Sequence, residues 1–502
     1  MTLFNGSDGR HIFFLKDKEE TQQVKQNFGF KTNKSAPQCS QLLPFETDLL
    51  NMIKNVEFKK FRTPFQNKLA KDVKMIKKSE KVIVPADKTS NYYEIDKADY
   101  KKLVRDSVTA KYTIDNTNIE DKINREAKEI AKKLDLADRV EVIANNEAFI
   151  NLKDHKENFQ NNPKVRLINP AKTEIGKICK EIVQQINEEL REKTKLKQWR
   201  NTEQVIEWFK AIDNKQTKQF LQLDIEEFYP SITENNIDKA MEFANKHTNL
   251  IDQEVKSIIK AASRSILFSN GKAWTKTNQN IDISMGAYAG AEICELVGLH
   301  ILDQIRTEFP DLNMGLYRDD GLACHEIKPG PELEKMKKKI IKIFKANNLK
   351  ITIDTNLSQV NFLDVTFDIK RDKYWPYKKP NDATLYIHKD SNHPKNVIKE
   401  LPKSVNKRLS TISSDRNVFE KNKTEYQEAL EKSGFTDRLE YKEYEKNKDE
   451  KEKKNKRKRK ILWYNPPFNA AVKSNIGKQF ITLIEKHFPK SNKLSKIINK
   501  TM

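Results

Sequence analysis

Two adjacent aspartates, Asp319 and Asp320, lie in the apolar stretch MGLYRDDGLAC, residues 314–324. Neighbouring carboxylates repel each other, and burying a carboxylate without a partner is unfavourable. One explanation is a surface β-turn in which Gly321 adopts a positive φ. The other is a divalent-metal site at the tip of a β-hairpin, because a bound cation would turn the repulsion into attraction. The stretch alone leaves both explanations open.

A third carboxylate, Asp224, follows the strand-like run in LQLDIEEFYPSI. By itself, an aspartate at the end of a strand is typical of a cap or a turn. If this strand lies beside the hairpin, however, the three carboxylates form a site of hard oxygen ligands. Mg²⁺ favours a few carboxylates completed by substrate phosphates, and a pair of such ions supports in-line phosphoryl transfer. The three residues therefore predict two Mg²⁺ ions, with Mn²⁺ as a substitute ion.

The elements expected around these carboxylates alternate between strands and helices. The run KVIVPADKTSNYYEID begins as a strand and continues into a turn, and AFINLKDHKENFQNNPKVRLINP predicts a hairpin with an Asn-rich turn. Helical spacing of apolar residues occurs in NIEDKINREAKEIAKKL, ENNIDKAMEFANKH and AGAEICELVGLHILDQIRTEF. Beyond about residue 376 the sequence becomes helical and basic, and no internal repeat is found.

The composition favours a polyanionic partner. The 502 residues include 94 Lys and Arg against 72 Asp and Glu, a formal charge of +22, and only 37% are hydrophobic. Nucleic acid is the first candidate partner and an anionic membrane the second, while a merely solvated surface is the alternative. No apolar run is long enough to span a membrane, and the N-terminus does not resemble a signal peptide. We therefore expect an intracellular protein of the nucleus, the cytoplasm or both.

The four cysteines are far apart and form no CxxC pair, and the eight histidines show no ligand-like spacing. This pattern fits reduced intracellular thiols better than disulfides or a zinc site.

Several of these strings together resemble the motifs of reverse transcriptases. In order, LDIEEFYPSI, SMGAYAGAEICELVGLHIL, LYRDDGLA and VNFLDVTFDI resemble motifs A, B, C and E, and INLKDHK and NPKVRLINP resemble the fingers motifs. The string YIHKDSNHPKNVIKELPKSVNKRLSTIS resembles the start of the thumb in Penelope-like retroelements, and Met285-Gly286 is also similar to that group. The similarity covers residues 81 to 430. Motif B lacks the usual Ser-Pro elements, and no GIY-YIG endonuclease motif is found.

The resemblance implies an α+β fold of the right-hand polymerase type, with fingers, an antiparallel-sheet palm and a helical thumb. The expected parts are an N-terminal extension, fingers, palm, thumb, and a charged linker with a basic C-terminal tail, over residues 1–80, 81–215, 216–375, 376–440 and 441–502. The implied partners are an RNA template, a DNA primer and dNTPs. The sequence does not determine the oligomeric state.

The resemblance also implies roles for the acidic residues. Asp224 and Asp319 would be the principal ligands of both metal ions, and Asp320 a supporting ligand. Ile225 would add its backbone carbonyl oxygen.

Further residues are implied to bind the substrates. Tyr229 would be the steric gate against a 2′-hydroxyl, with an ordinary core aromatic as the alternative. Gly286 would let the backbone approach the nascent base pair. Arg166, with either Lys153 or Lys156, would neutralise triphosphate oxygens.

The remaining candidates are less specific. Lys350 is a candidate for protonating the departing pyrophosphate, with a plain surface lysine as the alternative. Phe362 and Leu363 would lie at the primer grip. Asp87 and Lys88 lie in a family-like segment to which the sequence gives no role.

Three functions compete at this stage. The first is an active RNA-directed DNA polymerase of a retroelement, and the second is a polymerase-derived nucleic-acid-binding protein that has lost its chemistry. The three acidic residues favour the first, and the altered motif B keeps the second open. The third, an unrelated basic RNA-binding protein, requires the ordered motifs to be a coincidence.

The basic run KKNKRKRK, residues 453–460, follows a mixed-charge segment that is too polar for a core. A nuclear-import signal, a nucleic-acid-binding patch and a solvated linker all remain open.

Overall fold

The structure is a computed structural model of the chain. It describes residues 3–5, 11–13, 40–59, 63–137, 143–156, 158–379, 382–444, 468–489 and 491–492. The basic run at 453–460, with its three interpretations, lies outside the described residues. No helix in the described part is both long and apolar enough to cross a membrane.

A five-stranded sheet lies at the centre of the described chain, in the order β14-β9-β13-β12-β8, and all of its strands except β8 come from the range expected to be the palm. All neighbours in it are antiparallel except β8 and β12. Its strands are β8 (Lys197–Gln198), β9 (Lys218–Ile225), β12 (Asn313–Tyr317), β13 (Asp320–Glu326) and β14 (Ile351–Leu357). The expected antiparallel-sheet palm is therefore present, with one parallel strand at its edge.

Each face of this sheet has its own core. Leu221, Leu223 and Ile225 of β9 pack with helices that cover one face, whereas Phe220 lies in a separate aromatic core on the other. Side chains alternate between the faces along a strand, so Asp224 points to the same side as Phe220, away from the helices. The helices that contribute to the first core are α5 (Ile119–Lys133), α6 (Ile175–Thr194), α8 (Phe228–Ser231), α9 (Glu234–His247), α10 (Gln253–Ala262), α11 (Gly290–Glu308) and α12 (Gly330–Ala346).

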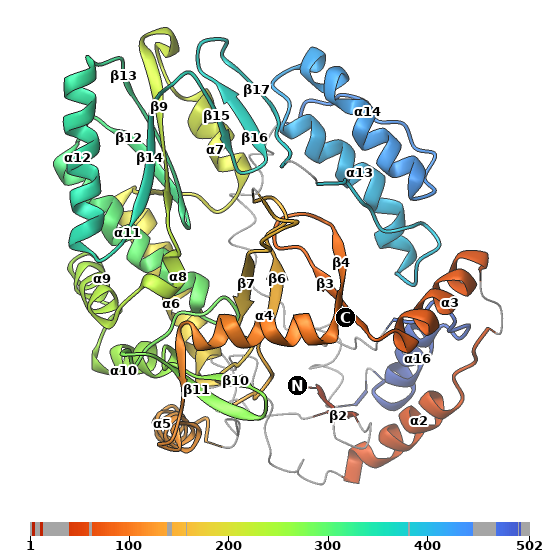
Figure 1. Ribbon diagram of the computed structural model, residues 1–502. Coiled ribbons are helices and arrows are strands. Elements are labelled where there is room, and N and C mark those ends of the chain that lie inside the picture. Colours follow the sequence, from red (N-terminus) through yellow and green to blue (C-terminus); the bar gives the residue numbers. More distant parts are fainter. Residues whose placement is uncertain are drawn as a thin grey trace.

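The aromatic core joins the sheet to a small three-stranded sheet. Phe209, Phe220 and Phe367 are all buried in it, and the rings of Phe209 and Phe367 lie 5.1 Å apart. Its other elements are α7 (Thr202–Lys210), β15 (Gln359–Phe362), β16 (Val365–Asp368) and β17 (Lys373–Pro376). This second layer lies toward the thumb in Figure 1.

The fingers contain the hairpin expected from the Asn-rich turn. Strands β6 (Phe149–Leu152) and β7 (Val165–Ile168) pair in antiparallel fashion, so this prediction is confirmed. The strand predicted at residues 82–84 is confirmed as β3 (Lys81–Pro85), which pairs with β4 (Tyr92–Asp96). The remaining elements between β4 and α11 are α4 (Lys97–Thr109), β5 (Tyr112–Ile114), β10 (Leu267–Ser269) and β11 (Lys272–Lys276).

Two antiparallel helices follow β17, where a helical thumb was expected. They are α13 (Lys395–Thr411) and α14 (Arg416–Lys432), and they enclose a core that includes Leu409, Phe419 and Leu430. The side chain of Asp415 begins α14 by accepting a hydrogen bond from the Val418 backbone N–H at 3.0 Å.

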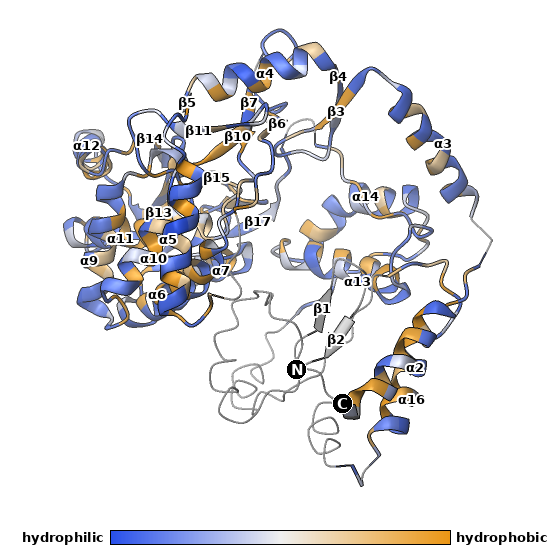
Figure 2. Cartoon of the chain, turned by 90° about the horizontal axis from the view of Figure 1, so that it is seen from below, coloured by the Kyte–Doolittle hydropathy of each residue, from blue (hydrophilic) through white to orange (hydrophobic). Residues whose placement is uncertain are grey.

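The two ends of the described chain pack together. Helices α2 (Leu43–Lys54) and α16 (Ile476–His487) bury Phe45, Leu49, Phe480 and Ile484 against each other, as their facing apolar residues in Figure 2 show. Asp48 lies 2.6 Å from the ammonium of Lys486. The remaining N-terminal elements are β1 (Leu3–Asn5), β2 (His11–Phe13) and α3 (Pro64–Lys78). The N-terminal extension and the C-terminal segment, expected as separate parts, therefore share one core.

Candidate active site

The Asp-Asp pair lies at the tip of the β12–β13 hairpin. Tyr317 pairs with Asp320, so the turn consists of Arg318 and Asp319 alone. Arg318 takes the positive φ of +55°, which two-residue hairpin turns require. The expectation that Gly321 supplies this φ is wrong. Gly321 lies in β13, where a Cβ would come within 2.7 Å of Leu223 and 2.9 Å of Leu316, so glycine is needed there for close packing.

Strand β9 brings Asp224 to the same place. Asp224 and Asp320 are direct partners across the β9–β13 pair, so their side chains leave the same face of the sheet next to each other. The backbone N–H of Ile225 donates to the carbonyl oxygen of Asp319 at 2.9 Å, which fixes the turn against the end of β9. The Ile225 side chain itself is buried. The structure therefore brings together the three carboxylates, although they come from segments far apart in the sequence.

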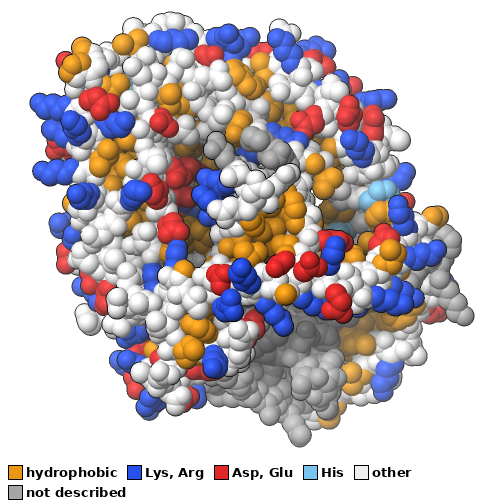
Figure 3. Space-filling view, in the orientation of Figure 1, with side chains coloured by type: hydrophobic (Ala, Val, Ile, Leu, Met, Phe, Trp, Pro, Cys, Tyr) orange, Lys and Arg blue, Asp and Glu red, His pale blue; other side chains and the backbone are white. Residues whose placement is uncertain are grey.

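The electrostatics of the three carboxylates are unfavourable without a ligand. Within the described residues, none of Asp224, Asp319 and Asp320 accepts a side-chain hydrogen bond or forms an ion pair. Burial, followed by the charges of Asp319 and Asp224, raises the pKa of Asp320 to about 6. Partial burial and the charge of Asp319 also raise the pKa of Asp224. Acidic side chains gather beside basic ones at the hollowed centre of this face in Figure 3.

These residues fit a magnesium site that substrate completes. In the described part of the chain, no three Asp, Glu, His or Cys side chains form a ready-made metal cage. Mg²⁺ does not require one, because it keeps waters and takes substrate phosphates as ligands. Among the described residues, Asp224, Asp319 and Asp320 offer carboxylate oxygens that form no ion pair, and a divalent cation would relieve their mutual repulsion.

A cavity of about 340 Å³ opens beside the turn. It is lined by Asp87, Arg166, Ile168, Tyr229, Ser284, Met285, Ala287, Ala291, Arg318 and Asp319. Tyr229 is only 8% exposed, so its ring belongs both to the core and to the wall of the cavity. The core and steric-gate interpretations of Tyr229 are thus compatible.

Arg166 enters the cavity from β7 of the fingers. Its Nε lies 3.1 Å from Asp87 Oδ1, and its Nη1 donates to the Met285 sulfur at 3.1 Å. The charge of Lys156 acts on the Asp224 carboxylate. Burial, followed by the charge of Arg166, lowers the pKa of Lys153. Neither lysine lines the cavity, but the charge of each acts on a residue of this region, so the structure does not reduce the pair to one.

Gly286 and Lys350 both lie against other groups of the protein, although roles toward the substrates were expected for them. A Cβ at Gly286 would lie 1.8 Å from the Asn169 carbonyl oxygen, so the close approach is to the fingers backbone. The Lys350 ammonium forms a 2.7 Å ion pair with Glu226, and its side chain is 78% exposed. The surface-lysine alternative thus accounts for the position of Lys350 in the absence of substrate.

The primer-grip pair is split by the structure. Phe362 is 1% exposed and packs against the Trp199 ring at 5.5 Å, so its side chain is part of the aromatic core. Leu363 follows in the β15–β16 turn with a φ of +56° and stays half-buried. The Phe362 side chain is therefore covered by the aromatic core, whereas the Leu363 side chain is partly exposed, and the primer-grip assignment of the pair stays a prediction.

Two lysines near the carboxylates were not predicted as site residues. The charges of Lys88 and Lys379 both act on Asp320. Lys88 lies in the family-like PADK segment, but Lys379 follows β17 in a run of lysines that offers no signal of its own.

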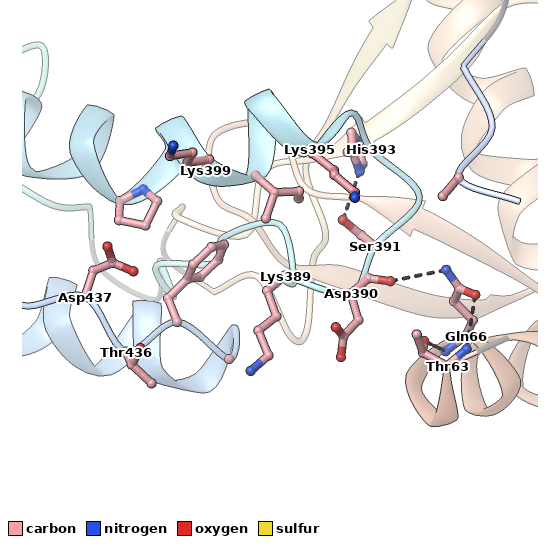
Figure 4. A pocket seen from close by; sticks show the side chains of 15 residues that line it. Thr63, Gln66, Lys389, Asp390, Ser391, His393, Lys395, Lys399, Thr436 and Asp437 are labelled. Carbon is pink, nitrogen blue, oxygen red and sulfur yellow. Dashed lines mark hydrogen bonds between the residues drawn. The ribbon is translucent and has the colours of Figure 1, made fainter. Parts of the chain in front are cut away.

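A second cavity, of about 500 Å³, lies away from the carboxylates, where α13, the end of α14 and the start of α3 meet. Figure 4 shows Lys389, Lys395 and Lys399 around it together with Asp390 and Asp437. Gln66 Nε2 donates to the Asp390 carbonyl oxygen at 3.3 Å across this junction. The cavity therefore marks the contact between the thumb and the N-terminal extension.

No protein-family model matches the sequence, and no curated protein matches it. Among solved structures, the chain is similar to a telomerase from Candida albicans in complex with a TWJ fragment of telomeric RNA, with a TM-score of 0.49 and 10% identity. That match covers 72% of this chain and 64% of the telomerase, which is less than two thirds of its length.

Two further structures are similar to a lesser degree. The apo telomerase from Candida tropicalis matches with a TM-score of 0.43 and 10% identity, over 78% of this chain and 74% of the telomerase. The RNA-dependent RNA polymerase of BmCPV at the elongation state matches with a TM-score of 0.40 and 11% identity, over 78% of this chain and 33% of the polymerase.

Proposed function

We propose that this protein is an RNA-directed DNA polymerase that extends a primer 3′-hydroxyl by nucleotidyl transfer. One observation carries the proposal: Asp224 and Asp320 are direct partners on adjacent strands, Asp319 lies in the turn beside them, and no described side chain forms an ion pair with any of the three carboxylates. A protein that only binds nucleic acid gains nothing from three converging acids, because they repel phosphates.

Each residue at the site has a role in this proposal. Asp224 and Asp319 hold the metal ions, and Asp320 and the Ile225 carbonyl oxygen support them. When bound, Mg²⁺ activates the attacking hydroxyl and stabilises the leaving oxygen. Arg166 neutralises triphosphate oxygens from the fingers side of the cavity, and its ion pair with Asp87 holds the guanidinium in place.

Tyr229 supports deoxyribonucleotides as the substrates. Its ring lies in the wall of the same cavity as Arg166 and Asp319, where it would exclude a 2′-hydroxyl. The net charge of +22 supports a nucleic-acid template and primer. The motif strings, with Met285-Gly286 in motif B, support the finer assignment to the Penelope-like reverse transcriptases.

Primer extension on a homopolymer RNA–DNA hybrid tests the proposal. We expect dNTP-dependent extension with Mg²⁺ and none with EDTA, and much less extension when rNTPs replace dNTPs. Tight binding of the hybrid without any extension, in either Mg²⁺ or Mn²⁺, would instead favour the catalytically inactive polymerase-derived binding protein.

A further inference from the structure

Two segments that are far apart in the sequence meet near the three carboxylates. One is the loop 86–91 between β3 and β4, which extends toward β15–β17 in Figure 1. The other is the chain after β17 that leads to the thumb. The backbone N–H and the hydroxyl of Ser90 donate to Asp382 Oδ1 at 3.0 and 3.2 Å, and the hydroxyl also lies against the Ala383 carbonyl oxygen. The two segments are therefore linked directly.

The loop is also anchored to the fingers hairpin. The backbone N–H of Asp87 donates to the Leu152 carbonyl oxygen at 2.7 Å. The Thr89 hydroxyl and the Asn91 amide donate to Asp154 Oδ2 at 2.6 and 2.9 Å. With contacts on both sides, Lys88 has a backbone position that is fixed relative to β6 and to the thumb segment.

This arrangement places Lys88 next to Lys379. Lys379 is half-buried, and burial, followed by the charge of Lys88 and a contact with its side chain, lowers the Lys379 pKa. Neither ammonium forms an ion pair within the described residues. The acid on which both charges act is Asp320, and in the proposed function metal ions neutralise that acid.

Two ammonium groups in contact repel each other, and the repulsion is largest where water is partly excluded. A phosphate group accepts hydrogen bonds from both and brings the opposite charge. We propose that Lys88 of the fingers loop and Lys379 of the thumb segment form a clamp that binds a phosphate group beside the metal site. This proposal rests on the proposed function, because the clamp needs the carboxylates to be neutralised by metal.

The phosphate has two sources in a polymerase. It belongs either to the triphosphate of the incoming nucleotide or to the backbone of the template–primer duplex. The chemistry of the clamp is the same for both, so binding of two separate probes distinguishes them.

The test measures equilibrium binding of inorganic tripolyphosphate and, separately, of an RNA–DNA duplex, both with Mg²⁺ and without turnover. The variants are Lys88→Gln, Lys379→Gln and the double variant. Lys81→Gln is the matched control, because Lys81 begins β3, the strand that leads to the loop of Lys88, and among the described residues its ammonium pairs with the exposed Glu94 alone. We expect the double variant to bind one of the probes about tenfold or more weakly, and the control to bind both normally.

The probe whose binding weakens in the double variant identifies the source of the phosphate. Weaker tripolyphosphate binding with an unchanged duplex indicates the nucleotide, and the reverse indicates the duplex backbone, with a smaller slope of log K against log salt. Lys88→Arg should keep the affinity because it keeps the charge. The thermal midpoint of each Gln variant checks that the free protein stays folded, because each change removes both a repulsion between lysines and an attraction to Asp320.

Unchanged affinity for both probes overturns the clamp. Tighter Mg²⁺ binding with no effect on either probe also overturns it, since the lysines would then serve only as counter-charges for the carboxylates. These readouts need no catalysis. A protein without extension activity whose phosphate binding depends on Lys88 and Lys379 would refute the polymerase and keep the clamp.

Discussion

Asp154 of the fingers and Asp320 of the palm are both shielded aspartates near the end of a β-strand, yet their surroundings are opposite. Asp154 Oδ2 accepts hydrogen bonds from Thr89, Asn91 and Tyr93 at 2.6, 2.9 and 2.9 Å. Although burial alone would raise it, the pKa of Asp154 is lowered on balance by these hydrogen bonds. Asp320 has no such donor, and its pKa is raised to about 6.

The difference in hydrogen-bond donors distinguishes a carboxylate that stabilises the fold from one that has no protein donor and can bind a ligand. Donors from β4 and the loop 86–91 converge on Asp154, which follows β6, so its charge holds β4, β6 and the loop 86–91 together. At Asp320 the nearest charged groups include two further carboxylates, so its charge destabilises the free protein. Substituting the two residues should therefore affect different properties: stability at Asp154 and chemistry at the palm site.

The largest effect is expected at the palm carboxylates. Asp319→Asn or Asp224→Asn should reduce extension by about a thousandfold or more, because a metal ligand and its charge are lost where transition-state charge develops. Duplex affinity should remain, since phosphate contacts elsewhere supply it. Single-nucleotide extension rates and a duplex titration measure the two properties separately. Asp320→Asn should be less severe if Asp320 only supports the ions.

Asp311→Asn is the matched control for this comparison, because Asp311 is exposed just before β12 and lies outside the site. It should extend primers at the normal rate. Near-normal extension by Asp319→Asn would contradict the assignment of Asp319 as a metal ligand.

The next effect is expected on stability, at Asp154. Asp154→Asn replaces a charged acceptor of three hydrogen bonds by a neutral one and should lower the free energy of unfolding at pH 7 by about 2–3 kcal/mol. Denaturant unfolding of both proteins measures the difference. An unchanged free energy of unfolding would mean that hydrogen bonds from the three donors to Asp154 stabilise the fold no more than hydrogen bonds from the same donors to water.

Wild type and Asp154→Asn should also differ in how their stability depends on pH, and the direction of the Asp154 pKa shift gives the sign of that difference. The pKa of Asp154 is lower in the folded than in the unfolded protein, so its stabilising contribution is complete above the unfolded value of about 4. It is lost as the pH falls through the lower, folded value. The stability difference between wild type and Asp154→Asn should therefore be constant from about pH 5 to 7 and shrink below about pH 4.

The sequence predicted the site best where the local pattern of residues agrees with the way the strands pair. The carboxylate at the end of one strand and the Asp-Asp pair of the hairpin led to the prediction that the three lie together if the strands are neighbours, and the register of β9 and β13 makes Asp224 and Asp320 direct partners. Local pattern could not show which turn residue takes the positive φ, since that depends on the register that selects Arg318 over Gly321. Nor could it show that Phe362 is covered by Trp199, a residue from a distant segment.

Contacts between distant segments explain the other differences. Helices α2 and α16 meet although more than four hundred residues separate Asp48 from Lys486. The charge of Lys379 acts on Asp320, and nearby Asp382 is bound to the fingers loop at Ser90. Neither contact has a local signature, since each side looks like an ordinary polar or amphipathic segment by itself.

The contact between the motif B segment and the fingers backbone requires a glycine at position 286. A Cβ there would lie 1.8 Å from the Asn169 carbonyl oxygen, so Gly286→Ala must push the motif B segment away from the fingers. We expect a loss of about 1–3 kcal/mol in the free energy of unfolding, together with slower extension. Gly330→Ala is the control, because nothing lies within 4 Å of its added Cβ. Equal stability of the two variants would refute a close contact between motif B and the fingers.

The smallest effect is expected on substrate selection, at Tyr229 in the wall between the fingers arginine and the palm turn. Tyr229→Ala removes the wall against a 2′-hydroxyl, so the preference for dNTPs over rNTPs should fall by about tenfold or more. Because Tyr229 is 8% exposed, the substitution also weakens the core, and only the ratio of kcat/KM for the two nucleotides reports the gate. Tyr229→Phe keeps the ring and should keep the ratio. If Tyr229→Ala slows both nucleotides equally and leaves the ratio unchanged, Tyr229 is a core residue alone, and the cavity it shares with Arg166 selects the sugar by other contacts.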